Sequence, residues 1–278
     1  MRIANSNNPF SREPCGMGKI AGGKKPLTPM RVFRAVQNRV MDRLQPLNAF
    51  RGVYADFPEA ERAAPPTKPL GYDAADSADW YLKKLAGVQL EDYPVLYWLR
   101  AAFDDSRTLL EIGGHVGVAY YGFSRVIQYP ADLRWTILDV PSVVDAGTRL
   151  ARERGRTDVA FVKGLAETEG AEILLAAGAL QYFDAPSLAG TITALRVKPK
   201  HVLVNVTPVY DGPGFVTLQN IGSVYCPYRI FNRQEFIAPL EALGYRLVDA
   251  WEKPRPFSVP KHPDRSFDAY SGFYLRRG

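Results

Sequence analysis

Residues 108–117 read Thr-Leu-Leu-Glu-Ile-Gly-Gly-His-Val-Gly, and this stretch decides the fold. A short apolar run carries Glu111 near its end and is followed by three glycines, Gly113, Gly114 and Gly117. The pattern predicts a buried strand that enters a tight turn and opens a helix. Glycine suits such a turn because the backbone there uses angles closed to other residues and comes close to a bound ligand. A second apolar strand, residues 135–138, ends at Asp139, 22 residues beyond Gly117, which is about where a nucleotide-binding fold places its ribose-binding carboxylate.

The spacing of the glycines distinguishes between cofactors. A dinucleotide fingerprint requires G-x-G-x-x-G, and no register of these three glycines supplies it. An acid followed by G-G-x-x-G resembles instead the first motif of class I S-adenosylmethionine-dependent methyltransferases, an acid and then G-x-G-x-G, with His115 in place of the middle glycine. The resemblance implies that Gly113 and Gly117 line the methionine part of the cofactor with Glu111 beneath it, and that Asp139 holds the ribose hydroxyls. A plain strand-helix turn without a ligand is the alternative reading of the glycines alone.

Three later segments extend the resemblance. Residues 138–144, Leu-Asp-Val-Pro-Ser-Val-Val, resemble the end of the second strand in small-molecule O-methyltransferases. Residues 177–182, Ala-Gly-Ala-Leu-Gln-Tyr, together with Thr207-Pro208 and Gln219-Asn220, resemble a branch of methyltransferases often found in surface-polysaccharide biosynthesis clusters. The similarity spans roughly residues 50–278. It adds four residues to the implied cofactor-binding set: Gly114, His115, Val140 and Gly178.

The composition indicates a globular protein with a distinct basic segment. A length of 278 residues suits one large domain or one domain plus a small appendage. No apolar run is long enough to span a membrane and no signal-peptide core precedes the domain, so we expect a cytoplasmic protein. Two cysteines, Cys15 and Cys226, lack the spacing of a disulfide framework or a zinc site, and we expect no metal.

The positive charge is concentrated at the N-terminal end. Residues 1–50 carry nine Lys and Arg against two acids, a balance of +7, whereas the rest of the chain carries 26 against 27, a balance of −1. A neutral body argues against a nucleic-acid groove. We expect residues 1–29 to be a disordered basic arm, residues 30–70 to form a helical appendage and linker, and residues 71–278 to form the methyltransferase domain. The basic amphipathic helix expected over 30–44 could contact anionic lipid or a protein partner, although packing on its own domain is the commoner role of such a helix.

Alternating strand and helix patterns continue to the end of the chain. Strands are predicted at 159–162, 172–177 and 201–206, and helices at 142–154, 187–197 and 233–243. This order predicts an α/β, Rossmann-like, doubly wound and mostly parallel sheet with helices on both faces. Two closing strands are expected at 245–251 and 271–276, joined by a proline-rich loop, 252–270, that is too long for a tight hairpin. By resemblance, one closing strand runs antiparallel at the sheet edge.

No residue stands out as a general base. Small-molecule O-methyltransferases resembling this chain often carry a histidine after the fourth strand, where this sequence has Gln181 and Tyr182. Gln181 cannot take a proton and could only orient the acceptor. His262, expected in the mobile proline-rich loop, is the remaining base candidate, with a solvated surface histidine as the alternative. These three residues are the candidate catalytic set.

The sequence therefore favours methyl transfer from S-adenosylmethionine to a small-molecule or glycan-precursor acceptor, with oxygen as the favoured atom. One alternative is an NAD-binding or nucleotide-sugar oxidoreductase or epimerase, which the glycine spacing and the lack of a Tyr-x-x-x-Lys pair oppose. The other is a non-catalytic cofactor-binding partner subunit, suggested by the basic helix and the missing base. The oligomeric state, a homodimer included, stays open.

Overall fold

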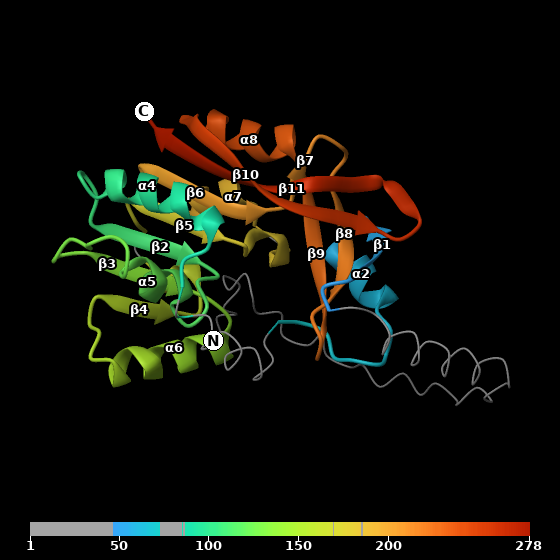
Figure 1. The fold of residues 1–278 in the computed structure, drawn as a ribbon, viewed down its shortest axis with the longest axis horizontal. Helices are drawn as coiled ribbons and strands as arrows, with labels where there is room; N and C mark the ends of the chain where they lie inside the picture. Colours follow the sequence, from blue (N-terminus) through green and yellow to red (C-terminus); the bar gives the residue numbers. More distant parts are fainter. Residues whose placement is uncertain (1–46, 73–84, 86, 169, 185) are drawn as a thin grey trace, which may run out of the picture.

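The computed structural model describes residues 47–72, 85, 87–168, 170–184 and 186–278, and a seven-stranded sheet forms its centre (Figure 1). The strand order is β10-β11-β6-β5-β2-β3-β4. Five of these strands are parallel: β2 (Thr108–Ile112), β3 (Arg134–Leu138), β4 (Val159–Val162), β5 (Ile173–Ala177) and β6 (His201–Thr207). The last two strands are β10 (Tyr245–Val259) and β11 (His262–Arg277), and β11 runs antiparallel to β6. The predicted α/β, doubly wound fold is confirmed.

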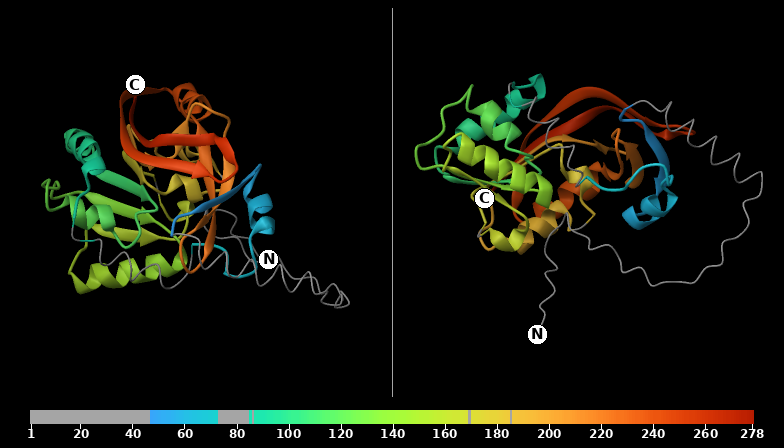
Figure 2. Two further views of the ribbon diagram at one scale, coloured as in Figure 1. Left: turned by 45° about the vertical axis from the view of Figure 1, so that its right-hand side comes forward. Right: turned by 90° about the horizontal axis from the view of Figure 1, so that it is seen from below.

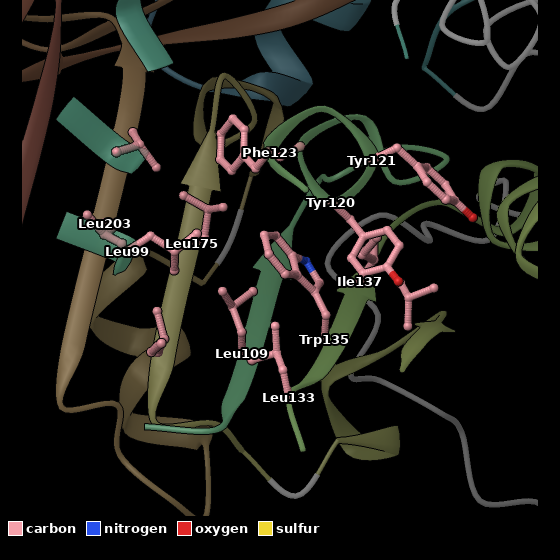
Figure 3. Packing of buried hydrophobic residues seen from close by; sticks show 14 of the residues in the cluster. Leu99, Leu109, Tyr120, Tyr121, Phe123, Leu133, Trp135, Ile137, Leu175 and Leu203 are labelled. Carbon is pink, nitrogen blue, oxygen red and sulfur yellow. The ribbon is translucent and has the colours of Figure 1, made fainter. Parts of the chain in front are cut away.

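Helices cover both faces of this sheet because its strands are apolar on both sides. One face packs against α4 (Tyr93–Ala102), α5 (Val118–Phe123) and α6 (Pro141–Glu153). Figure 3 shows the core of this face, where Trp135 lies among the leucines of the neighbouring strands and the aromatic side chains of α5. The other face packs against α7 (Leu188–Ala194) and α8 (Arg233–Ala242).

The connections of the parallel strands create a reversal point in the centre of the sheet. The chain runs from β2 outward through β3 and β4, and then returns to the other side of β2 to form β5 and β6. The loops after β2 and β5 therefore lead in opposite directions from neighbouring strands. In open α/β sheets, ligands bind at such a point, outside the carboxyl ends of the strands.

A second, four-stranded sheet lies beyond those carboxyl ends, as the views of Figures 1 and 2 agree. Its order is β1-β8-β9-β7, with β1 at Phe50–Tyr54, β8 at Phe215–Asn220, β9 at Tyr225–Asn232 and β7 at Val209–Tyr210. Helix α2 (Phe57–Ala63) contacts it through the buried side chains of Phe57 and Ala60, which pack with Val216. The sequence assigned residues 30–70 to a helical appendage and linker, whereas the structure places a strand from this range in the second sheet. The basic arm 1–29 and the helix predicted over 30–44 lie outside the described residues, as does most of the segment 73–86.

The prediction of a proline-rich loop over residues 252–270 is wrong. β10 and β11 pair along almost their whole length, and the hairpin turns between Val259 and His262. Pro254 lies inside β10, opposite Ala269, because β10 is an edge strand whose other side needs no backbone donor. The resemblance predicts that one closing strand is antiparallel, and β11 is. The edge of the sheet is formed by β10, which lies beyond β11. The outer half of the hairpin packs on the second sheet through Phe257, Val259 and Tyr270.

None of the helices in the described part of the chain combines the length and apolar character needed to cross a membrane.

Candidate functional site

The glycine loop after β2 has the left-handed backbone that its sequence predicts. Gly113 and Gly117 have φ values of 68° and 93°, and the Gly113 amide donates to the Leu138 carbonyl at 2.8 Å. A Cβ atom at Gly113 would lie 2.3 Å from Cβ of Ala179, so no side chain fits between this loop and the loop after β5. His115 takes the place of a glycine and is itself left-handed, with φ 55°. The loop thus leaves bare backbone at the reversal point of the sheet.

Asp139 fixes this loop in place. Its buried carboxylate accepts hydrogen bonds from the backbone amides of His115 and Val140, one on each oxygen and both at 2.8 Å. Pro141, at the first turn of α6, needs no amide partner there. A carboxylate oxygen can accept more than one hydrogen bond, so holding the loop does not exclude a contact between Asp139 and a ligand hydroxyl.

Glu111 lies beneath the loop, with 2% of its surface exposed. Its Oε2 accepts a hydrogen bond from Nε1 of Trp135 at 2.8 Å. Burial raises the pKa of the Glu111 carboxyl to about 8, and the charges of Asp139 and Asp92 add to the increase. Gly114 covers this side chain so closely that a Cβ there would lie 2.4 Å from Cδ of Glu111. The carboxyl is therefore mostly protonated at neutral pH while the site holds no positive charge.

The turn after β5, η3 (Leu180–Tyr182), carries two of the candidate catalytic residues. Gln181 is buried, and its Nε2 donates to the carbonyl of Gly178 at 2.7 Å. Its Oε1 has no hydrogen-bond partner among the described residues. The hydroxyl of Tyr182 points the other way and donates to Oε1 of Gln219 on β8 at 2.7 Å. This turn therefore connects the reversal point of the parallel sheet to the second sheet.

The second sheet surrounds Tyr182 with aromatic and amide groups. The Tyr182 ring lies 5.2 Å from that of Tyr228 in an edge-to-face arrangement. Gln219, which accepts from Tyr182, donates through Nε2 to Oδ1 of Asn48 at 3.2 Å. The Tyr228 hydroxyl donates to that of Tyr270 at 3.3 Å, and burial raises the pKa of both phenols. A tyrosine hydroxyl held by an amide among these phenols can orient a hydroxylated ligand.

The histidines lie in different parts of the structure. His262 is half-buried at the tip of the β10–β11 hairpin, opposite Val259, and no hydrogen bond joins it to Gln181 or Tyr182 in the described part of the chain. His201 lies at the start of β6, at the opposite end of the sheet from the glycine loop, and its ring bridges Tyr274 (2.7 Å) and Asp105 (2.9 Å). That pairing gives His201 a structural role. Within the described residues, no three His, Cys, Asp or Glu side chains are grouped to hold a metal ion.

Two polar residues near the loop were not predicted from the sequence. Asp92 ends the turn η1 (Leu90–Asp92) and accepts hydrogen bonds from the Gln89 amide (3.0 Å) and from Nδ2 of Asn205 (3.2 Å). Asn205 lies on β6 with 1% of its surface exposed. In the sequence, Asp92 signals only the start of a helix, and Asn205 interrupts an apolar strand without any motif.

The comparisons with known proteins return solved structures only, since neither a family model nor a curated protein matches the sequence. One is the 1,6-didemethyltoxoflavin-N1-methyltransferase of Burkholderia thailandensis, with bound 1,6-didemethyltoxoflavin and S-adenosylhomocysteine: it is 17% identical, covers 92% of this chain and 93% of its own, and gives a TM-score of 0.48. Another is the magnesium protoporphyrin IX methyltransferase of Synechocystis PCC 6803 with bound S-adenosylmethionine. It is 10% identical, covers 74% of this chain and 85% of its own, and gives a TM-score of 0.46. The mitomycin 7-O-methyltransferase MmcR is 17% identical, covers 90% of this chain and 69% of its own, and gives a TM-score of 0.43. The assignment of a function therefore rests on the residues of the site.

Proposed function

We propose that this protein is a class I methyltransferase that transfers the methyl group of S-adenosylmethionine to a small-molecule or glycan-precursor acceptor. The observation that carries the proposal is the loop at the reversal point, where Gly113, Gly114 and Gly117 leave bare backbone above Glu111 and beside Asp139. A Cβ at Gly113 would meet Ala179 and a Cβ at Gly114 would meet Glu111, so both positions require glycine and the loop surface is bare backbone. The loop therefore fits a ligand that presses against backbone, as the methionine part of the cofactor would.

The side chains at the loop fit this cofactor better than NAD. Two buried carboxyl groups, Glu111 and Asp139, face the loop and give it negative charge when they are ionised. S-adenosylmethionine carries an ammonium and a sulfonium charge, whereas NAD brings a pyrophosphate that requires donors or cations. The glycine spacing also lacks the dinucleotide pattern. Gly113, Gly114, His115, Gly117 and the Val140 and Gly178 backbones complete the proposed cofactor-binding set around the two acids.

The proposed acceptor site lies between the turn after β5 and the second sheet. When bound, the cofactor supplies an activated methyl group, so the protein must mainly align the acceptor with it. Tyr182 reaches from that turn to Gln219, and Gln181 presents a buried oxygen that accepts no hydrogen bond from the described residues. These groups suit an acceptor with hydroxyl groups, and oxygen is the proposed site of methylation. His262 stays a proposed base because its strand neighbour Val259 packs on the second sheet, although none of the hydrogen bonds found among the described residues joins it to Gln181 or Tyr182.

The proposal extends to the surroundings of the protein. We infer a role in the cytoplasm, in the biosynthesis of a surface polysaccharide, on the resemblance carried by residues 177–182 and 219–220. The basic segment 30–44 is proposed to contact a membrane surface or a protein, and a homodimer is compatible with the proposal.

Calorimetric titration with S-adenosylmethionine, S-adenosylhomocysteine and NAD tests the cofactor. We expect the first two to bind and NAD not to bind. Asp139→Ala should weaken binding at least about tenfold, because a charge-assisted hydrogen bond contributes about 1.5–3 kcal/mol. Asp145→Ala is the matched control, since this exposed acid on α6 pairs with Lys163 at the surface. Binding of NAD, or of none of the three, would overturn the proposal.

Transfer of a labelled methyl group from S-adenosylmethionine tests the acceptor class and the non-catalytic alternative together. The panel would contain free sugars, nucleotide-activated sugars and catechol as a hydroxylated compound that is not a sugar. Label in a sugar supports the proposed acceptor. Label in catechol alone would support methyl transfer but refute the glycan class, and cofactor binding without label in any compound would favour the partner-subunit alternative.

A further inference from the structure

Asp92 lies over the same face of the parallel sheet as Glu111. Side chains alternate along a strand, and Glu111 on β2 shares the face of Leu109 and Leu203, which pack under α4. The register pairs Glu111 with Leu175 and Asn205 with Ala177, so Asn205 also points to this face, one pleat nearer the carboxyl ends. Two strand spacings, about 10 Å, separate β2 from β6. Asp92 is bound to Asn205 and therefore lies at the carboxyl edge of this face, beside the site.

A continuous set of hydrogen bonds connects Asp92 to the turn that carries Gln181. Asn205 donates from Nδ2 to Asp92 (3.2 Å), and its backbone carbonyl accepts from the Gly178 amide (2.8 Å). The Gly178 carbonyl in turn accepts from Nε2 of Gln181 (2.7 Å). Asn205 is itself oriented by Nε1 of Trp251, which donates to its Oδ1 at 3.0 Å. The position of the Asp92 carboxylate is thus fixed by the same contacts that hold the edge of the proposed cofactor site.

Among the residues that the structure describes, this network has more hydrogen-bond acceptors than donors. The Asp92 carboxylate and the buried Oε1 of Gln181 both accept, and the latter has no donor among the described residues; Glu111 becomes a further carboxylate acceptor when a bound cation removes its proton. One nearby cation, Lys253, is paired with Glu91. Burial raises the pKa of Asp92, with Glu91 adding to the increase and Lys253 opposing it. A ligand with a positive charge and several N–H donors would remove this imbalance.

We propose that Asp92 is a further cofactor-binding residue, whose carboxylate accepts hydrogen bonds from the α-ammonium group of S-adenosylmethionine together with Glu111. The inference rests on the proposed function, because it assigns a residue to the cofactor of that site. It makes η1, a segment before the first parallel strand, part of the cofactor site. It also explains why Asn205, a polar residue in an apolar strand, is buried under α4: it holds Asp92 toward the loop.

Calorimetric titration of the full chain with three ligands tests the inference. S-adenosylmethionine and S-adenosylhomocysteine both carry the α-ammonium group, whereas 5′-methylthioadenosine keeps the adenosine and the sulfur but has no amino-acid part. Asp92→Asn should weaken the first two equally, by about 10- to 100-fold, because one charge-assisted hydrogen bond is lost. Binding of 5′-methylthioadenosine should change less than about twofold. Glu91→Gln is the matched control, since it removes the neighbouring charge on the same turn and should leave all three affinities unchanged.

The outcomes separate the two proposals. If the unaltered protein binds none of the three ligands, the proposed function fails and Asp92 loses its role with it. If it binds them and Asp92→Asn binds all three as well as before, the inference alone is refuted. Equal weakening of 5′-methylthioadenosine would also refute it, because the effect would then not involve the ammonium group. Should Asp92→Asn melt at a lower temperature, Asp92→Glu supplies a folded variant with the charge retained, and it should keep the preference for the two amino-acid-bearing ligands.

Discussion

Replacement of Glu111 by Gln should make the stability of the protein less dependent on pH. In the unfolded chain the carboxyl loses its proton near its ordinary pKa of 4.5, whereas in the folded protein it does so near 8. Below the unfolded pKa both states hold the proton, and burial of Glu111 then has no electrostatic cost. As pH rises from 4.5 to about 8, the unfolded chain binds fewer protons than the folded protein, so the free energy of unfolding falls. Above about 8 the full cost of the buried charge is present.

The size of the effect follows from the shift. Each pKa unit corresponds to about 1.4 kcal/mol, so a shift from 4.5 to about 8 corresponds to about 5 kcal/mol. Glu111→Gln keeps an oxygen that can accept from Trp135 but has no proton to lose. We expect the variant and the unaltered protein to melt at similar temperatures near about pH 5, and the variant to melt about 10–20 °C higher near about pH 9. Thermal melts of both proteins across this range are the measurement. A difference in melting temperature that stays constant with pH would refute the assignment of a buried, protonated Glu111.

Three further predictions concern the same region. Binding of S-adenosylmethionine at about pH 7 should release most of a proton, because a ligand cation lowers the pKa of Glu111. Calorimetric titrations in two buffers of different ionisation enthalpy measure this release. Equal binding heats in the two buffers would show that no proton is released. Gly113→Ala should abolish cofactor binding and destabilise the fold by about 1–3 kcal/mol, since the new Cβ meets Ala179, whereas Gly155→Ala, also left-handed but with open space around it, should change only the melting temperature. Tyr182→Phe should lower the rate of methyl transfer without weakening cofactor binding, because Gln219 loses its hydrogen-bond donor. Tyr210→Phe is the control, since the Tyr210 hydroxyl donates to the Pro213 carbonyl at the edge of the second sheet. An equal loss of methyl transfer in both variants would argue against a special role for Tyr182.

The parallel sheet could be predicted because each of its signals is local. The strand 108–112 and its glycine turn are set by neighbouring residues, and the helix of 141–153 begins at a proline that favours a first turn. The predicted strands at 159–162 and 201–206 likewise agree with β4 and β6 within one residue. Their apolar runs are continuous because both faces are covered, and a continuous run is easily recognised.

The second sheet and the hairpin could not be predicted because their signals depend on distant partners. β1 is a five-residue strand interrupted by Gly52, with a bulge between Arg51 and Tyr54, and its pairing with β8 leaves no trace in its own sequence. Four prolines between 252 and 270 indicate a loop unless β10 is known to be an edge strand. The candidate site follows the same division. Glu111 and Asp139 could be predicted because each lies at the end of a strand at a recognisable distance from the glycines. Asp92 and Asn48 could not, because their places at the site depend on contacts made across the fold.

The pairing of β1 with β8 affects how the protein folds while it is being synthesised. Arg51 and Thr217, which share a hydrogen bond across this pair, are 166 residues apart in sequence. On the ribosome, β1 therefore emerges long before its partner and stays unpaired while the parallel strands are made. The outer half of the β10–β11 hairpin, which covers the second sheet, is made later still. Contacts of such high separation slow folding and leave an unpaired strand open to wrong association in the meantime.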